Sequence, residues 1–288
     1  MGRFIEETIS SVLAQDYPNI EYLVIDGGSS DGTIEILKRY AGRLRYLSEP
    51  DRGQADAVNK GFLQTTGEIF TFLNADDTLL PGAVSTAVRA FRENPEAVVT
   101  YGNAWYVAED GSRIGPYPVE EYNADNLARR CFICQPAAFI RRDAFAEVGM
   151  LDASLHYAMD YDLWIRLARL YSNATGASMN TRAAMKKIDA ALATSRLHPS
   201  SKTVDQMGPA LRAAIAVLER HYGYVPFNWL YGYWHHRLAG QPLAVEKPRP
   251  SVASACLSIA FGVRYNWRSP LRYLRDILDT ARERFGAR

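Results

Sequence analysis

The feature that most constrains the fold is the alternation of short apolar runs with helical patterns in the first half of the chain. Residues 22–25, 44–47 and 69–73 are apolar runs with the length of buried strands. Between them, apolar residues recur at helical spacing, for example over 55–62. Strands that alternate with helices are typical of βαβ units, which bury a parallel sheet between helices. The sequence therefore predicts an α/β fold with a mostly parallel sheet flanked by helices.

The remainder of the chain follows other patterns. Closely spaced β-type runs over 98–114 predict a mixed or antiparallel edge of the sheet. The segment 171–184 is rich in Ser, Asn, Thr, Ala and Gly, which predicts a surface loop. Beyond Lys202 the apolar residues recur at helical spacing. We therefore expect an α/β domain over 1–203 and a helical extension over 204–288.

The charge balance argues against a nucleic-acid-binding protein. The 288 residues include 33 Lys and Arg against 32 Asp and Glu, a formal charge of +1, whereas phosphate binding needs a basic stripe. Only the stretch 264–288 is basic, with seven Arg against three acidic residues. Leu271, Leu274 and Leu278 recur there at helical spacing. This stretch is expected to favour anionic surfaces, and peripheral membrane contact through the basic C-terminal helix is one hypothesis.

The cysteines and the start of the chain indicate the cytoplasm. Three cysteines are too few for a disulfide framework, so Cys131, Cys134 and Cys256 are expected to be reduced thiols. The Cys-x-x-Cys spacing is compatible with a redox pair, but the apolar residues within and after it favour a buried strand. No basic region precedes an apolar run at the N-terminus, and the longest apolar window, 252–263, is too short to span a bilayer.

An acidic side chain ends the first predicted strand. Ligands of open α/β sheets bind beyond the carboxyl ends of the strands. Asp26 lies at such an end, and Gly28 follows in a run of small residues that lets a ligand approach the backbone. A carboxylate there can accept hydrogen bonds from a nucleobase or a ribose. The alternative is a tight turn whose polar residues cap the next helix.

Two adjacent acidic residues end the strand at 69–73. Asp76 and Asp77 follow Asn74, and adjacent carboxylates repel each other. A divalent cation is a common reason for such a pair, because Mg²⁺ and Mn²⁺ take carboxylate oxygens and keep positions open for substrate phosphates. The alternative is a solvated turn before the next helix.

Three further segments carry candidate polar side chains. Gln54 and Asp56 lie in the first turn of a predicted helix, where backbone N–H groups attract phosphate. Asp160 opens an apolar helix, either as a helix cap or as an exposed base. Arg196 and His198 follow an apolar run at a strand end, where they meet either a diphosphate or the acids of the protein itself.

The order of these motifs resembles the family 2 glycosyltransferases, inverting enzymes of the GT-A fold, a Rossmann-like architecture. The resemblance runs from residue 3 to about residue 203. The motifs, in chain order, are Ile-Asp-Gly-Gly-Ser-Ser-Asp-Gly-Thr (25–33), Asp-Arg-Gly-Gln (51–54), Asn-Ala-Asp-Asp (74–77), Gln-Pro-Ala (135–137), Met-Asp-Tyr-Asp-Leu-Trp (159–164) and Arg-Leu-His-Pro-Ser-Ser-Lys (196–202).

The resemblance implies a role for each motif. In the family, an Asp recognises the nucleotide base, a pair of acids holds Mn²⁺ or Mg²⁺ against the diphosphate, and a later acid is the catalytic base. These roles correspond to Asp26, to Asp76 with Asp77, and to Asp160. The other residues that the resemblance assigns to the donor side are Gly28, Gln54, Asp56, Asn74, Arg196 and His198, with Gln135 on the acceptor side.

The implied reaction moves a sugar from a UDP- or GDP-sugar to a hydroxyl of a saccharide or lipid-linked acceptor, in the synthesis of polysaccharides or glycoconjugates. Asp160 would deprotonate the acceptor hydroxyl while a metal neutralises the departing diphosphate. One rival is a catalytically impaired sugar-nucleotide-binding protein or scaffold. A second rival, a nucleotidyltransferase, needs a Gly-rich phosphate loop near the N-terminus, and the sequence printed here has none.

Two departures from the family pattern carry expectations of their own. Family members begin with an apolar strand and a turn before the helix that here starts at Arg3. We therefore expect a sheet without that central strand, so that 22–25 and 69–73 each lack a partner on one side. Asn74 replaces the commoner first Asp of the metal motif and Met159 replaces a Glu, so metal affinity is expected to fall.

Overall fold

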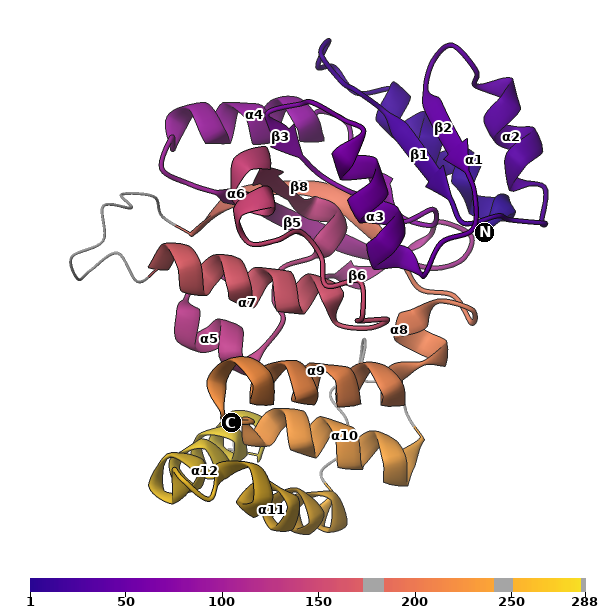
Figure 1. Cartoon of the computed structure of the whole chain (residues 1–288). Helices are drawn as coiled ribbons and strands as arrows, with labels where there is room; N and C mark the ends of the chain where they lie inside the picture. Colours follow the sequence, from indigo (N-terminus) through magenta and orange to yellow (C-terminus); the bar gives the residue numbers. More distant parts are fainter. Residues whose placement is uncertain (173–183, 241–250, 286–288) are drawn as a thin grey trace. The chain divides into compact units, whose positions relative to one another are not determined.

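The computed structural model describes residues 1–172, 184–240 and 251–285, so most of the loop predicted over 171–184 lies outside the described residues (Figure 1). The chain divides into two compact units. Unit 1 comprises Met1–Ala124 with Cys131–Leu197, and unit 2 comprises Asp125–Arg130 with His198–Arg288. The division near residue 197 lies a few residues before the boundary that the sequence suggests.

A two-stranded parallel sheet holds the first predicted strands of unit 1. It consists of β1 (Leu23–Asp26) and β2 (Arg45–Ser48), with Asp26 opposite Ser48. Two helices, α1 (Gly2–Leu13) and α2 (Thr33–Arg39), bury apolar residues against these strands. The predicted strands over 22–25 and 44–47 are confirmed, because short apolar runs of this kind need burial on a sheet.

A six-stranded sheet forms the rest of unit 1. Its order is β3-β7-β5-β8-β4, and β6 pairs with the last residues of β5, Trp105, Tyr106 and Val107. The strands are β3 (Ile69–Phe70), β4 (Thr78–Leu79), β5 (Val99–Val107), β6 (Arg113–Pro116), β7 (Ala138–Arg141) and β8 (Met185–Arg196).

The strand pairing corrects the prediction of a mostly parallel sheet, although the α/β class is confirmed. Within the described residues, β5 and β8 are parallel and the other pairs of the six-stranded sheet are antiparallel. Parallel pairing needs a long crossover, which the chain between β5 and β8 provides. The strands β4, β6 and β7 run opposite to β5 and β8, and β3 runs in the same direction as β5. The predicted strand over 69–73 is shorter than expected because the chain leaves the sheet after Phe70.

The strands β1 and β3 each have a neighbouring strand on one side, as the sequence led us to expect. In the part of the chain that the structure describes, β1 pairs with β2 alone and β3 pairs with β7 alone. Their apolar residues are correspondingly half-buried, in contrast to the fully buried start of β5.

Helices cover the strands of unit 1. They are α3 (Gln54–Leu63), α4 (Ala83–Glu93), α6 (Arg142–Glu147), α7 (Met159–Ser172) and the 3₁₀ turn η1 (Gln135–Ala137). The helix predicted over 55–62 is confirmed as α3. The strand predicted around the two cysteines begins later, at Ala138, because Pro136 lies in the 3₁₀ turn that precedes it. Cys131 and Cys134 are free thiols, and burial raises the pKa of both, which disfavours redox chemistry.

Unit 2 is helical. Its helices are α5 (Ala124–Arg129), α8 (Lys202–Asp205), α9 (Met207–Tyr222), α10 (Phe227–Ala239), α11 (Val252–Asn266) and α12 (Pro270–Phe285). Within this unit α10 packs on α9 and on both α11 and α12 (Figure 1). Gly223 and Gly240 end α9 and α10 in the left-handed conformation that glycine adopts most readily. Among the described residues, no helix has the length and hydropathy needed to cross a membrane.

Candidate active site

Asn74 joins several of the residues that the sequence singled out. Its side-chain oxygen accepts a hydrogen bond from Gln54 at the start of α3. Its Nδ2 donates to Asp77 Oδ2 at 2.9 Å and lies 3.4 Å from Gln135 Oε1. Gln135 in turn donates to the carbonyl of Phe72, which lies two residues after the end of β3. The loop 74–77 is therefore fixed from both sides, by α3 and by the turn before β7.

The Asp77 carboxylate lies inside this arrangement. Its Oδ1 accepts the backbone N–H of Arg196 at 2.9 Å, while Oδ2 accepts from Asn74. Burial, followed by the charge of Asp76, raises the pKa of Asp77 to about 7. Through these two hydrogen bonds Asp77 braces the loop, and its role as a cation ligand stays a prediction.

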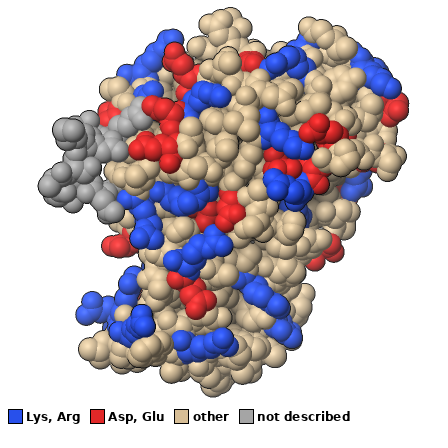
Figure 2. Space-filling view, viewed as in Figure 1, with Lys and Arg blue, Asp and Glu red and all other residues tan. Residues whose placement is uncertain are grey.

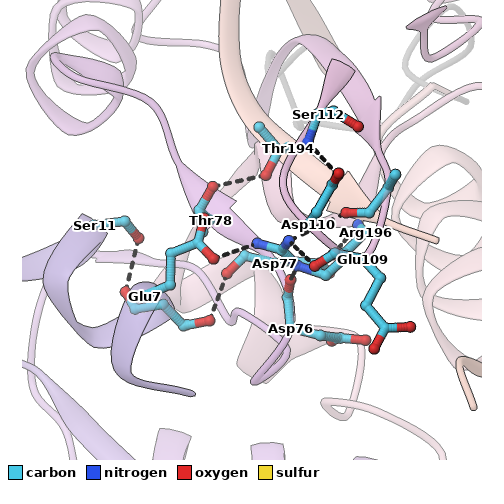
Figure 3. A network of polar contacts seen from close by, with 12 residues as sticks. Glu7, Ser11, Asp76, Asp77, Thr78, Glu109, Asp110, Ser112, Thr194 and Arg196 are labelled. Carbon is cyan, nitrogen blue, oxygen red and sulfur yellow. Dashed lines mark hydrogen bonds and ion pairs between the residues drawn. The ribbon is translucent and has the colours of Figure 1, made fainter. Parts of the chain in front are cut away.

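The Arg196 guanidinium is also bound by the protein (Figure 3). Its Nη2 pairs with Glu7 at 2.6 Å, and its Nε donates to the Asp76 carbonyl at 3.0 Å. Its Nη1 lies within hydrogen-bond distance of two carbonyls, those of Ala108 and Glu109. Only 1% of the Arg196 side chain is exposed. The interpretation of Arg196 as a diphosphate ligand is therefore replaced by the alternative, contact with the groups of the protein itself.

His198, the other residue predicted at this strand end, is buried and is the first residue of the second segment of unit 2. Its backbone carbonyl accepts from Ser201, where the chain turns toward α8. A role of its imidazole in donor binding stays a prediction.

Helix α1 holds the acidic loop through residues that the sequence analysis did not select. The Thr8 hydroxyl lies 2.9 Å from the Ala75 carbonyl and 2.8 Å from the Asp77 carbonyl, and donates to this pair. Ser11 accepts the N–H of Leu79. A signal for Thr8 was present, because it interrupts the apolar face of its helix, and a polar group on a buried face needs a partner. Glu7 carried no such signal.

Asp26 occupies the end of β1, where the sequence placed it. Its Oδ2 accepts the N–H groups of Gly28 and Ser29 at 3.0 Å and the Ser48 hydroxyl at 2.7 Å. Gly28 has φ +90°, which favours glycine. Burial alone would raise the pKa of Asp26, but the hydrogen bonds from Ser29 and Ser48 outweigh it and hold this pKa below the usual value. Asp26 is therefore ionised at neutral pH.

The loop before α3 lies against the loop after β1. A Cβ at Gly27 would stand 2.4 Å from Asp51 Oδ2, so a larger residue there would displace the Asp51 carboxylate. Asp56, in the first turn of α3, accepts the N–H of Arg52 at 3.1 Å and its guanidinium at 2.8 Å. These hydrogen bonds lower the pKa of Asp56. The carboxylate thus stabilises the start of α3, and a direct donor contact stays a prediction.

Asp160 lies half-buried in the first turn of α7. The loop before it starts and ends at two non-glycine residues with positive φ, Met150 at 62° and Ala158 at 56°, a conformation that persists only where its surroundings enforce it. The Asn59 amide fixes this loop by bonding both the N–H and the carbonyl of Leu151, at 3.0 and 2.8 Å.

The donor set of this region fits an oxygen-bound divalent cation. In the described parts of the chain, no group of three or more His, Cys, Asp or Glu side chains could hold a metal ion by itself. Asp76 and Asp77 both stay candidate ligands, since each Asp77 oxygen accepts one hydrogen bond and a carboxylate oxygen can accept more. Mg²⁺ is usually bound by one or two carboxylates together with water and substrate phosphates, so the residues present suit a cation that arrives with a diphosphate.

Solved structures with a similar fold are glycosyltransferases. TarS of S. aureus, solved with UDP, matches with a TM-score of 0.56 and 16% identity over 96% of this chain and 84% of the TarS chain. The mannosyltransferase PcManGT of Pyrobaculum calidifontis, solved with GDP-Man and Mn²⁺, matches with a TM-score of 0.57 and 18% identity over 96% of this chain and 83% of its own. At such identities the likeness shows the fold, which is GT-A.

One relative by sequence is named a glycosyltransferase, and another is named for O-antigen biosynthesis. An uncharacterized glycosyltransferase of Rickettsia typhi is 29% identical over 179 residues, which cover 59% of this chain and 56% of the relative. An O-antigen biosynthesis protein, RfbC of Myxococcus xanthus, is 30% identical over 175 residues, which cover 59% of this chain and 14% of that protein. The chain thus matches about half of the Rickettsia relative and a small part of RfbC.

The family model for glycosyl transferase family 2 matches residues 2–149, just over half of the chain. This segment includes α1, the Asp26 loop, the start of α3, the acidic loop and η1. The chain therefore belongs to glycosyl transferase family 2.

Proposed function

We propose that the chain transfers a sugar from a nucleotide-diphospho-sugar to an acceptor hydroxyl, with inversion at the anomeric carbon. The observation that carries this proposal is the hydrogen-bond chain from Gln54 through Asn74 to Asp77 and Gln135. It holds Gln54 and Gln135, from two other motifs, against the acidic loop. Such a fixed arrangement suits a site that must orient a diphosphate and an acceptor together.

Asp26 is proposed to bind the nucleoside of the donor. Its carboxylate is ionised, lies at the end of β1 and is held by the backbone of its own loop. An ionised acceptor suits the N–H groups of a base or the hydroxyls of a ribose. Structures with the same fold contain UDP, UDP-GlcNAc and GDP-Man, which supports a UDP- or GDP-sugar as donor.

A divalent cation, Mn²⁺ or Mg²⁺, is proposed to bind between Asp76 and the donor diphosphate. When bound, it supplies positive charge that stabilises the departing nucleoside diphosphate. Asp77 and Asn74 would keep the Asp76 backbone in place. Mn²⁺ in a solved neighbour supports this assignment.

Asp160 is proposed as the base that takes the proton from the acceptor hydroxyl. Its place in the first turn of α7, half-buried and behind a fixed loop, suits a group that faces a second substrate. The O-antigen name of RfbC supports a saccharide or lipid-linked acceptor in polysaccharide synthesis. Free thiols at Cys131, Cys134 and Cys256 fit the reducing cytoplasm.

The test is Asp160→Asn, assayed for sugar transfer and for binding of UDP and GDP by calorimetry. Loss of the base is expected to lower transfer by about 10²–10⁴-fold and to leave nucleotide binding within a few-fold. Asp152→Asn, in the loop before α7, is the matched control and should change neither. Near-normal transfer by Asp160→Asn would make Asp160 a helix cap. Binding of UDP or GDP without hydrolysis or transfer of any donor would favour the rival, an impaired binder or scaffold.

A further inference from the structure

Helix α11 of unit 2 turns its apolar residues outward. Five of its residues recur at intervals of four, three, four and four and form one exposed stripe. They are Val252, Cys256, Ile259, Val263 and Trp267. Val252 is 81% exposed, Val263 59% and Trp267 65%. Helices of globular proteins usually place such a stripe against the core.

The inward side of α11 consists of small or polar residues with defined partners. Asn266 bonds both the N–H and the carbonyl of Val225 at 2.9 Å. The Ser258 carbonyl accepts the Tyr273 hydroxyl at 2.6 Å. A Cβ at Gly262 would stand 1.7 Å from that hydroxyl, so no larger side chain fits this contact. Rotating α11 to bury its apolar stripe would break all of these contacts.

Helix α12 repeats this inverted arrangement. Leu271, Leu274 and Leu278 lie on its outer side and are 81%, 54% and 51% exposed. On its inner side, Asp276 is buried and accepts the N–H of Phe227. The stripe that the sequence places on α12 is thus real, but it faces away from the protein.

The exposed charge beside these stripes is positive. Exposed arginines of the two helices and the turn between them are Arg264, Arg268, Arg272, Arg275 and Arg282. The acidic residues nearby are already paired: Asp276 with Arg129, Glu283 with Arg129 and Arg130, and Asp279 with Arg282. On the face of unit 2 seen in Figure 2, blue side chains are separated by uncharged surface and little red is visible.

We propose that the exposed stripes of α11 and α12, which we call the α11–α12 outer face, bind the surface of an anionic lipid bilayer. Helices that lie in a membrane interface combine Leu and Trp on one side with Arg or Lys beside them, and basic residues near anionic lipid add to the affinity. Arginine stems can lie along apolar surface while the guanidinium stays with the headgroups. The helices lie on the bilayer, because no described helix has the length and hydropathy to cross it.

This inference does not depend on the reaction proposed for unit 1. Its test is flotation of the chain with vesicles of phosphatidylglycerol and phosphatidylcholine, compared with vesicles of phosphatidylcholine alone. The chain is expected to float with the anionic vesicles, and at high salt its affinity should fall at least tenfold. Absence of binding to the anionic vesicles, or equal binding to both kinds, overturns the proposal.

The residues are tested by the triple variant Leu271→Ser, Leu274→Ser and Leu278→Ser. It is expected to bind anionic vesicles at least tenfold more weakly, while its helix content by circular dichroism and its melting temperature stay close to those of the wild type and report an intact unit 2. Leu63→Ser and Leu238→Ser change leucines that are also exposed, at 68% and 53%, and should bind as the wild type does. Equal vesicle binding by the triple variant and the wild type contradicts the assignment.

Trp267 provides an independent readout. Its fluorescence should shift to the blue when anionic vesicles are added, and Trp267→Phe should remove that shift. Absence of a shift in the wild type overturns the placement of this residue in the interface. Sedimentation without lipid tests the other occupant of the face, a second copy of the chain. A dimer that the triple variant abolishes, together with no vesicle binding, would replace the bilayer with that copy.

Discussion

Asp26 is the last residue of β1, and Asp77 is the last residue of the segment between β3 and β4, but the surroundings of the two carboxylates differ. Asp26 accepts the amides of its own loop, and hydrogen bonds hold its pKa below the usual value. Asp77 is buried among groups from distant parts of the chain, and burial raises its pKa. The same pattern in the sequence, a strand followed by an acid, has thus produced one charged acceptor and one internal brace.

The difference shows that the role of an acidic residue near a strand end depends on which groups donate hydrogen bonds to it. At Asp26 two donors are N–H groups of its own loop, and the third is the Ser48 hydroxyl of the neighbouring strand β2. At Asp77 the donors come from Asn74 and from the backbone of Arg196. The acidic loop is therefore held in part by a distant segment, the backbone at Arg196, and Asp76 stays the proposed cation ligand.

The largest expected effect comes from Asp76→Ala. Donor binding should lose its dependence on Mn²⁺, and transfer should fall by about a thousandfold, because several kcal/mol of charge stabilisation disappear. Calorimetry with a UDP-sugar and a GDP-sugar, with Mn²⁺ or with EDTA, measures the binding. Asp110→Ala, an exposed turn residue of the same unit, is the control.

Asp77→Asn sharpens the comparison, because asparagine still offers an oxygen to the Arg196 N–H. It is expected to lower donor affinity by less than about tenfold. An effect as large as that of Asp76→Ala would restore Asp77 as a cation ligand. Equal donor affinity of the wild type in Mn²⁺ and in EDTA would remove the cation from both residues.

Arg196→Ala has the next largest effect, on stability. The variant removes the guanidinium donor from the carbonyls of Asp76, Ala108 and Glu109, of which the Ala108 carbonyl keeps the N–H of Gly111, so the free energy of unfolding should fall by about 2–4 kcal/mol. Urea denaturation measures it. Arg3→Ala removes an exposed pair with Glu109 and should cost less than about 1 kcal/mol.

A second readout of Arg196 separates positioning from general stability. Arg196→Lys can still pair with Glu7 but cannot reach all three carbonyls. Its donor affinity should therefore stay below that of the wild type, even if its free energy of unfolding returns to the wild-type value. If Arg196→Lys bound the donor as tightly as the wild type does, Arg196 would support only the fold.

The third-largest effect is expected from Asp26→Asn. Loss of the charged acceptor should weaken UDP or GDP binding about tenfold. The pKa of Asp26 is lowered in the fold, so its carboxylate stabilises the protein above the ordinary pKa of an aspartate, and this contribution is lost as the pH falls. The stability difference between wild type and variant should therefore shrink from about pH 6 to about pH 3. A difference that stays constant over this range would contradict the pKa direction.

The fold could be predicted where local sequence decides it. The strands β1 and β2 follow from apolar runs and the helix α3 from helical spacing, because these patterns lie within a single segment of the sequence. The mixed pairing of β3, β4 and β7 could not be predicted, since strand direction depends on contacts between distant segments. Helix α12 was found, but the outward direction of its leucines depends on the partners of Asp276 and Tyr273 in other helices.

The site could be predicted as a set of residues and less well as a set of roles. Asn74, Gln54 and Gln135 meet as the order of the motifs suggests. The internal role of Arg196 could not be read from sequence, because its main ion-pair partner, Glu7, lies 189 positions away and is itself exposed. Spacing along the chain carries no information on such a pair.

The smallest expected effect tests whether α1 holds the acidic loop by polar contact. Thr8 is buried, and its hydroxyl is shared by the Ala75 and Asp77 carbonyls. Thr8→Val keeps the shape and removes the hydroxyl, so it should cost about 1–2 kcal/mol. Thr8→Ser keeps the hydroxyl and removes one methyl group, which should cost about 1 kcal/mol or less. Urea denaturation of both variants gives the order, and packing alone would make serine the more damaging change. If valine is the more damaging, the polar tether from α1 fixes the loop around Asp77, a support that the loop of Asp26 obtains from its own backbone.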